Sequence, residues 1–143
     1  MTSPAQDFKS ILLTAGVGST DPDTDWGVHV SKEPESPHRT ITIYDTGGAE
    51  PNAKHLLDFN TVQVRVRGNV NDYPVAHTKI KDVKNKLLGL PKETVNGTVF
   101  VGVWAVGDII FLKYDDNNRP IFVSNWRTAL EPASGTNRTP LTG

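Results

Sequence analysis

Three strands predicted in the last third of the chain restrict its fold most, because both of their faces are apolar. Alternate residues of a strand point to opposite faces, so residues 98–106 place valines on one face and Phe100 and Trp104 on the other. Residues 108–114 and 120–130 show the same two-sided pattern. An apolar sheet face has to be covered by helices, a second sheet or another molecule. These strands therefore predict more apolar surface than one helical layer covers.

Two amphipathic helices are predicted to supply that layer. The first spans residues 3–15, where Ser3 and Gln6 have the spacing of a capping box and an apolar stripe follows. The second spans residues 72–88, with Asp72 as the expected N-cap. Its apolar stripe consists of Ala76, Ile80, Val83 and Leu87. Two helices suffice for one face of a sheet, and the other face of the last three strands stays uncovered.

Three more strands are predicted between the helices, at residues 26–31, 39–45 and 61–68. The last is the clearest, because its valines alternate with Gln63 and two arginines. The element order predicts an α+β fold with a mixed, mainly antiparallel sheet of about five or six strands and two helices packed on one face. Residues 1–131 are assigned to this single domain, and the polar residues 132–143 to a flexible C-terminal tail.

Composition excludes several classes of function. The 143 residues contain no cysteine, which rules out disulfides and thiol catalysis. No run of about 18 apolar residues is present, so no contact with a membrane is expected. A net charge of −1 is unlike that of proteins that bind DNA through its phosphates. The four histidines lie in different elements, and no metal site, cofactor or catalytic residue is predicted.

Residues 33–52 allow two unrelated interpretations. Two prolines lead into the strand at 39–45, and Asp45, Gly47 and Gly48 are predicted to form a structural turn that closes it. Alternatively, Asp45-Thr46-Gly47 resembles the catalytic motif of retroviral-type aspartic proteases, in which two such aspartates share a proton.

Several features disfavour the protease interpretation. Gly48 stands where these proteases have Ser or Ala. An apolar-apolar-Gly sequence does follow, at residues 87–89. However, the interval before it is filled by an amphipathic helix that these all-β enzymes do not carry there. We therefore expect a protein that is not an enzyme.

Four segments in order carry a family resemblance. They are EPESPHRTITIYDTGGAEPN (33–52), TVQVRVRG (61–68), NKLLGL (85–90) and DDNNRPIFVSNWR (115–127). Together they resemble the tail terminator proteins of long-tailed, siphovirus-type bacteriophages, also called minor capsid proteins. The turn at residues 117–118 lacks the usual glycine, and the residues after 130 show no family pattern.

The resemblance implies a structural virion protein without a cofactor. Six copies would form a homohexameric ring at the head-proximal end of the tail tube, ending tube polymerisation and offering the surface that joins tail to head. The partners would be the chain itself, the tail tube protein and a neck or head-completion protein. Genomic DNA would pass through the ring without sequence-specific binding. Assembly would take place in the host cytoplasm. A neck or head-completion ring protein of the same kind of phage is the main alternative.

Eight residues are predicted as contacts to a neighbouring subunit or to the tube. They come from the polar face of the strand at 61–68, from the turn at 115–119 and from the strand after it. They are Gln63, Arg65, Arg67, Asp115, Asp116, Arg119, Trp126 and Arg127.

Overall fold

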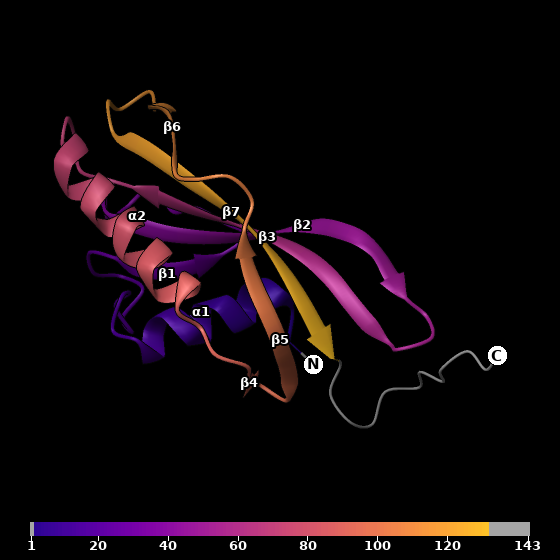
Figure 1. Ribbon diagram of the computed structural model, residues 1–143. Helices are drawn as coiled ribbons and strands as arrows, with labels where there is room; N and C mark the ends of the chain where they lie inside the picture. The colour runs from indigo at the N-terminus through magenta and orange to yellow at the C-terminus, as the bar shows by residue number, and fades with distance from the viewer. Residues whose placement is uncertain (1, 132–143) are drawn as a thin grey trace.

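The computed structural model describes residues 2–131 and contains two helices and one seven-stranded sheet (Figure 1). In chain order the elements are α1 (Pro4–Thr14), β1 (Gly27–Val30), β2 (Thr40–Asn52), β3 (Leu57–Arg67), α2 (Tyr73–Leu88), β4 (Glu93–Val95), β5 (Thr98–Ala105), β6 (Ile110–Tyr114) and β7 (Pro120–Glu131). The predicted flexible tail, residues 132–143, lies outside the described residues.

The sheet is mixed and mainly antiparallel, which confirms the predicted α+β class. Its order is β1-β2-β3-β7-β5-β4, and only β1 and β2 run parallel. Strands β5 and β6 share one edge of β7, with β6 along residues 120–123 and β5 along residues 126–131. The sequence did not predict β4, because three residues give too short a pattern to separate from a loop.

Both helices begin close to where the sequence places them, but only one has the expected cap. In α1, the Ser3 hydroxyl accepts a hydrogen bond from the Gln6 N–H at 3.2 Å, and the Gln6 side chain accepts one from the Ser3 N–H at 2.7 Å. In α2, Asp72 occupies the N-cap position without a side-chain cap hydrogen bond. Its carboxylate accepts instead from Arg39 Nη2 at 3.1 Å, so Asp72 stands at the predicted N-cap position but its side chain does not cap the helix.

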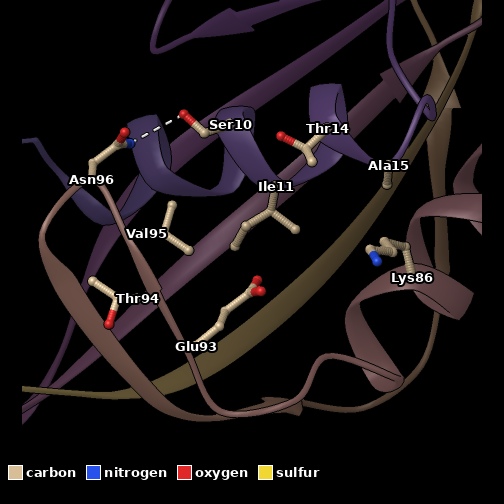
Figure 2. A pocket seen from close by; sticks show the side chains of 9 residues that line it. All are labelled: Ser10, Ile11, Thr14, Ala15, Lys86, Glu93, Thr94, Val95 and Asn96. Atoms are coloured by element: carbon tan, nitrogen blue, oxygen red, sulfur yellow. Dashed lines mark hydrogen bonds between the residues drawn. The ribbon is translucent and has the colours of Figure 1, made fainter.

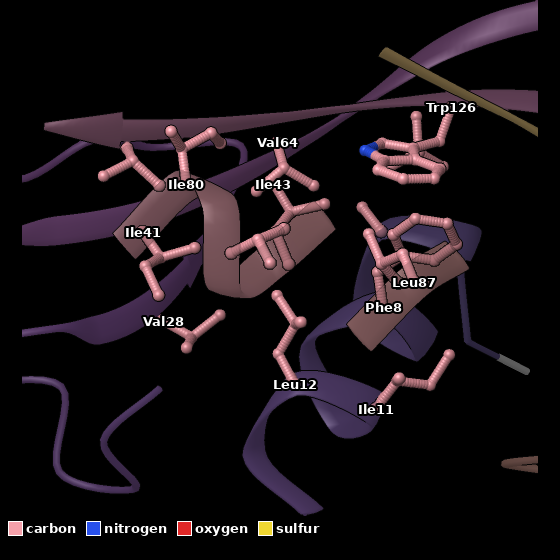
Figure 3. Packing of buried hydrophobic residues seen from close by; sticks show 14 of the residues in the cluster. Phe8, Ile11, Leu12, Val28, Ile41, Ile43, Val64, Ile80, Leu87 and Trp126 are labelled. Atoms are coloured by element: carbon pink, nitrogen blue, oxygen red, sulfur yellow. The ribbon is translucent and has the colours of Figure 1, made fainter. Parts of the chain in front are cut away.

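The core lies between the two helices and one face of the sheet (Figure 3). Val62, Val64 and Val66 all point to this face, as predicted, and are fully buried. Cross-strand pairing places Val64 beside Ile43 and Val62 beside Trp126. Each large side chain buried here contributes about 1.5–3 kcal/mol relative to an exposed one. The four predicted α2 core residues are likewise buried.

The predicted turn at Asp45, Gly47 and Gly48 is wrong, because β2 continues through it. The pairing of β2 with β3 shifts register between Asp45 and Gly48, which marks a β-bulge. The bulge places Gly47 at φ 90° and Gly48 at φ 138°, conformations that favour glycine. A Cβ on Gly48 would lie 2.1 Å from the carbonyl oxygen of Phe59. The chain reverses only at residues 53–56, so a long hairpin extends beyond the rest of the sheet (Figure 1).

Candidate functional site

The polar face of β3 is divided between a closed end and an open end. At the closed end, residues 31–39, here called the strap, cross the sheet face opposite the helices and cover Arg67. Arg67 is 2% exposed and donates hydrogen bonds to the carbonyls of His38 (2.9 Å) and Pro37 (2.8 Å). Its Nη1 also lies 2.9 Å from the Glu33 carboxylate. The arginine therefore fixes the strap to the sheet.

Arg119 also binds the strap. Its Nη1 donates to the Glu35 carbonyl at 2.7 Å, and its Nε donates to the Asp115 carboxylate at 2.7 Å. Burial alone would raise the pKa of Asp115, but hydrogen bonds from the backbone and side chain of Arg119 and from the Asn117 N–H outweigh it and lower the pKa. Asp115 thus orders both the turn and the arginine that reaches the strap.

Several predicted contact residues therefore have partners within the chain. Arg67 and Arg119 are buried under the strap. Trp126 is 1% exposed in the core, where its indole N–H donates to Ser124 Oγ at 2.9 Å. Asp116 is exposed in the β6–β7 turn. In this conformation the three buried side chains stabilise the fold and offer no contact surface to another molecule.

The open end of the same sheet face keeps the other predicted residues at the surface. The Arg65 guanidinium lies 5.6 Å from the centre of the Tyr44 ring, and that of Arg127 lies 5.4 Å from the Trp104 ring. Burial, with Glu33 nearby, raises the pKa of the Tyr44 hydroxyl. Tyrosine, tryptophan and arginine are the residue types that most often dominate binding energy at interfaces. The open end consists of Tyr44, Gln63, Arg65, Trp104, Asn125 and Arg127.

An apolar edge adjoins the open end. Of the eleven large hydrophobic side chains that are exposed in the described residues, seven lie within residues 101–114. We call these seven the β5–β6 strip: Val101, Trp104, Val106, Ile110, Phe111, Leu112 and Tyr114. Exposure ranges from 39% for Val101 to 49% for Val106. Exposed apolar side chains gathered in this way, in and between two strands on one edge of β7, are typical of a site of protein association. The strip confirms that the last strands carry surplus apolar surface.

Two surface grooves have volumes in the range of small-ligand sites. One, of about 340 Å³, lies between α1 and β4, and Figure 2 shows Ser10 bonded to Asn96 at its rim (3.1 Å). Another, of about 360 Å³, lies between α2 and β6 beside Tyr73 and Lys81. Residues 2–131 contain no cluster of three or more potential metal-binding side chains. Within the same residues, no helix has the length and apolarity to cross a bilayer.

Comparison with known proteins identifies the family. The family model described as bacteriophage tail terminator protein matches residues 11–132. This chain belongs to that family. It is accordingly a structural protein of a phage tail, and the family is not one of enzymes. A search of the curated proteins finds no match.

A solved structure supports the fold of this terminator-family chain. The chain resembles one from the virion of a native gene transfer agent particle, with a TM-score of 0.59 and 10% sequence identity. The similarity covers 91% of this chain and 99% of the other. A similarity at this identity concerns the fold, and the family match carries the assignment.

The terminator fold also gives Asp45 a structural role. Its carboxylate accepts a hydrogen bond from the Ala5 N–H at 2.9 Å, at the N-terminus of α1. The first N–H groups of a helix lack partners within the helix, and a carboxylate satisfies them well. Asp45 therefore ties β2 to α1, and its surroundings give no support to the aspartic protease interpretation.

The sequence did not reveal which residues cover the closed end of the sheet face or which ones complete its open end. Glu33 and the backbone of Glu35 bind the arginines, and Tyr44 and Trp104 complete the open end. The available signal for the strap was a pair of acids on either side of Pro34, just ahead of a strand that pairs with an arginine-bearing strand. The two-sided apolar pattern at residues 98–106 was the signal for Trp104.

Proposed function

We propose that this protein forms a ring that caps the head-proximal end of the phage tail tube, ends tube polymerisation and provides the surface to which the head joins. The observation that carries the proposal is the β5–β6 strip, which leaves seven large apolar side chains in water in a single copy. Covering that surface supplies the driving force for association, at about 25 cal/mol per Å² of apolar area buried. The family match indicates that the association belongs to a tail.

The ring is proposed to contain six copies, a number that rests on the resemblance to tail terminators. Its partners are the tail tube protein on one side and a neck or head-completion protein on the other. A cap that forms only on a finished tube has to remain unassembled before that point. The mixed character of the surface, with arginines and amides beside the apolar strip, suits a protein that is soluble alone and associates on a template.

DNA is proposed to pass through the ring without sequence-specific binding. Every arginine within residues 2–131 is already engaged inside the chain. Four of them pair with carboxylates, and Arg127 lies over the Trp104 ring. Phosphate binding depends on basic groups that are free to replace counterions. With the arginines engaged, lysines are the free basic groups of residues 2–131, and the net charge of −1 favours a passage that does not hold the DNA tightly.

Electron microscopy of the purified protein with tail tubes tests this function. Negative-stain images with mass photometry should show six-fold rings, free or at one end of each tube, and tubes so capped should no longer elongate when tube protein is added. Binding to isolated heads or portals, with no effect on tubes, would support the neck ring instead. A two-fold dimer that ignores tubes would contradict both ring proposals.

A further inference from the structure

The outer part of the β2–β3 hairpin is exposed and only partly paired. We call residues 46–60 the arm, which extends away from the body of the protein (Figure 1). Strand β1 pairs with β2 only from Thr40 to Ile43, so the outer edge of β2 has no partner strand farther out in the described residues. The β3 side of the arm pairs with β7 as far as Asp58, beside Leu130, and beyond that pair the arm is a two-stranded hairpin, which is marginally stable in water by itself. The arm is therefore a segment that gains stability from a neighbour.

Strand β6 is a second incompletely paired edge. All five residues of β6 are exposed, and within the described residues β6 pairs with β7 alone. Ile110, Phe111 and Leu112 give this edge an apolar surface. Natural proteins usually shorten, charge or cover such an edge, because it is a ready site for another chain. An apolar β6 edge indicates a surface that is covered in the assembled state.

The arm and the β6 edge lie at opposite ends of β7 (Figure 1). Near the arm, β7 pairs with β3 at Leu130, whereas β6 pairs with β7 no farther along than Val123. Seven residues of strand span roughly 23 Å, and the arm points away from β6. The arm of one copy thus stays away from its own β6. A closed ring of identical copies is held by two different patches, each meeting the other on the next copy.

Size and charge make the two surfaces complementary. Residues 46–49 of the arm are Thr, Gly, Gly and Ala, which leave room for the large side chains of the β6 edge. Glu50 on the arm and Lys113 on β6 are both exposed. Neither forms an ion pair within residues 2–131. A pair of opposite charges at such a contact fixes the register in which the two surfaces meet.

We propose that the arm of each copy lies against the β6 edge of the next copy, and that this contact closes the ring. The inference rests on the proposed function, since it names the surfaces by which the ring is held together. A second copy is the occupant because it supplies both the missing strand neighbour and the opposite charge. The contact places Glu50 of one copy near Lys113 of the next.

Cysteine cross-linking tests the contact cleanly, because the natural chain has no cysteine. One preparation carries Ala49→Cys in the arm and another carries Ile110→Cys in β6. Mixed with tail tubes under mild oxidation, the two should give a disulfide-linked dimer that neither gives alone. The control mixture replaces Ile110→Cys by Thr78→Cys, which is exposed on α2 outside both surfaces. The control should yield at least tenfold less dimer.

Charge exchange provides a second test that leaves the fold untouched, since both side chains are exposed. Glu50→Lys or Lys113→Glu alone should lower ring formation on tubes at least tenfold, and the double variant should restore it. Capping with neither specific cross-linking nor rescue would overturn the arm contact while the proposed function stands. Absence of rings and of tube binding in the natural protein would instead refute the proposed function and the contact with it.

Discussion

The two ends of the polar sheet face use similar residues for different purposes. At the closed end, Arg67 and Arg119 are almost fully buried, and carbonyls or carboxylates of the strap region bind them. At the open end, Arg65 and Arg127 lie over aromatic rings at the surface, beside the apolar β5–β6 strip. The chain satisfies the first pair by itself. The second pair is also engaged within the chain, Arg65 with Glu33 at 3.7 Å and Arg127 with the Trp104 ring, but it remains partly exposed.

This contrast shows how one short sequence pattern can supply both stability and assembly. The strand at residues 61–68 carries arginines two positions apart on the same face, yet the strap covers only one of them completely. A buried arginine without partners would destabilise the fold strongly, so its bonds are made within the chain. An exposed arginine beside an aromatic ring keeps its capacity to bind a partner.

Removing the closed-end arginine should produce the largest change in stability. Arg67→Met leaves two strap carbonyls and the Glu33 carboxylate without their buried donor, which should lower the free energy of unfolding by about 3 kcal/mol. Arg127→Met, at the exposed end, should cost less than about 1 kcal/mol. Urea unfolding followed by tryptophan fluorescence measures both. Equal losses would show that the two ends do not differ.

Placing charges on the β5–β6 strip should weaken binding to the tube and leave stability almost unchanged, which is the reverse of the effect expected for Arg67→Met. Ile110→Asp with Leu112→Asp should weaken tube-end binding by about 100-fold, or about 2.7 kcal/mol, and change the free energy of unfolding by less than about 1 kcal/mol. Val75→Asp is the matched control, an exposed apolar residue on α2. Co-sedimentation with tubes measures binding. The same loss of binding in the control would remove the strip from its assigned role.

A substitution at Asp45 should have a smaller effect, and it distinguishes a role in binding the N-terminus of α1 from a catalytic role. Asp45→Ala removes the acceptor for the Ala5 N–H and should cost about 1 kcal/mol of stability. Tube capping should persist, because no reacting group has been lost. Asp82→Ala, at an exposed position on α2, controls for the removal of a carboxylate and should change neither stability nor capping measurably. Complete loss of function in a folded Asp45→Ala protein would support the protease interpretation.

Lowering the pH should reveal how much the Asp115 carboxylate contributes to stability at the closed end. Its folded-state pKa lies below the ordinary value for an aspartate, so the stability it contributes is fully present above its unfolded pKa and is lost as the pH falls through the folded one. Denaturation midpoints between pH 7 and pH 2.5 should therefore fall more steeply for the natural protein than for Asp115→Asn. Parallel curves would assign the acid sensitivity to other carboxyl groups.

Local patterns in the sequence predicted most helices and strands. Features that depend on contacts between residues far apart in the chain could not be predicted. The Ser3–Gln6 capping box, the α2 stripe and the valine face of β3 follow from neighbouring residues and are confirmed. The strap, by contrast, depends on Arg67 meeting residues about 30 positions away. No local pattern in the sequence shows that these residues meet, so the burial of Arg67 could not be predicted.

Three differences between expectation and structure have the same physical origin, which is contact between residues far apart in the sequence. A Gly-Gly pair permits a reversal, but it also permits a bulge, and the length of β3 decided between them by pairing with β2 as far as Asn52. Asp72 has the residue type and position of an N-cap, but Arg39 competes for its carboxylate. Trp126 belongs to the core because pairing places it beside Val62, a register that the sequence alone does not give.

Hydrogen exchange measured with and without tail tubes would test the division of the sheet face most directly. Mass spectrometry of peptides from the ring-bound and free protein compares all regions in one experiment. Assembly should slow exchange in the arm and in residues 101–114 and leave it unchanged in the strap, which Arg67 and Arg119 already hold against the sheet. Protection confined to the strap or the helices, with the β5–β6 strip unaffected, would contradict this division of the sheet face.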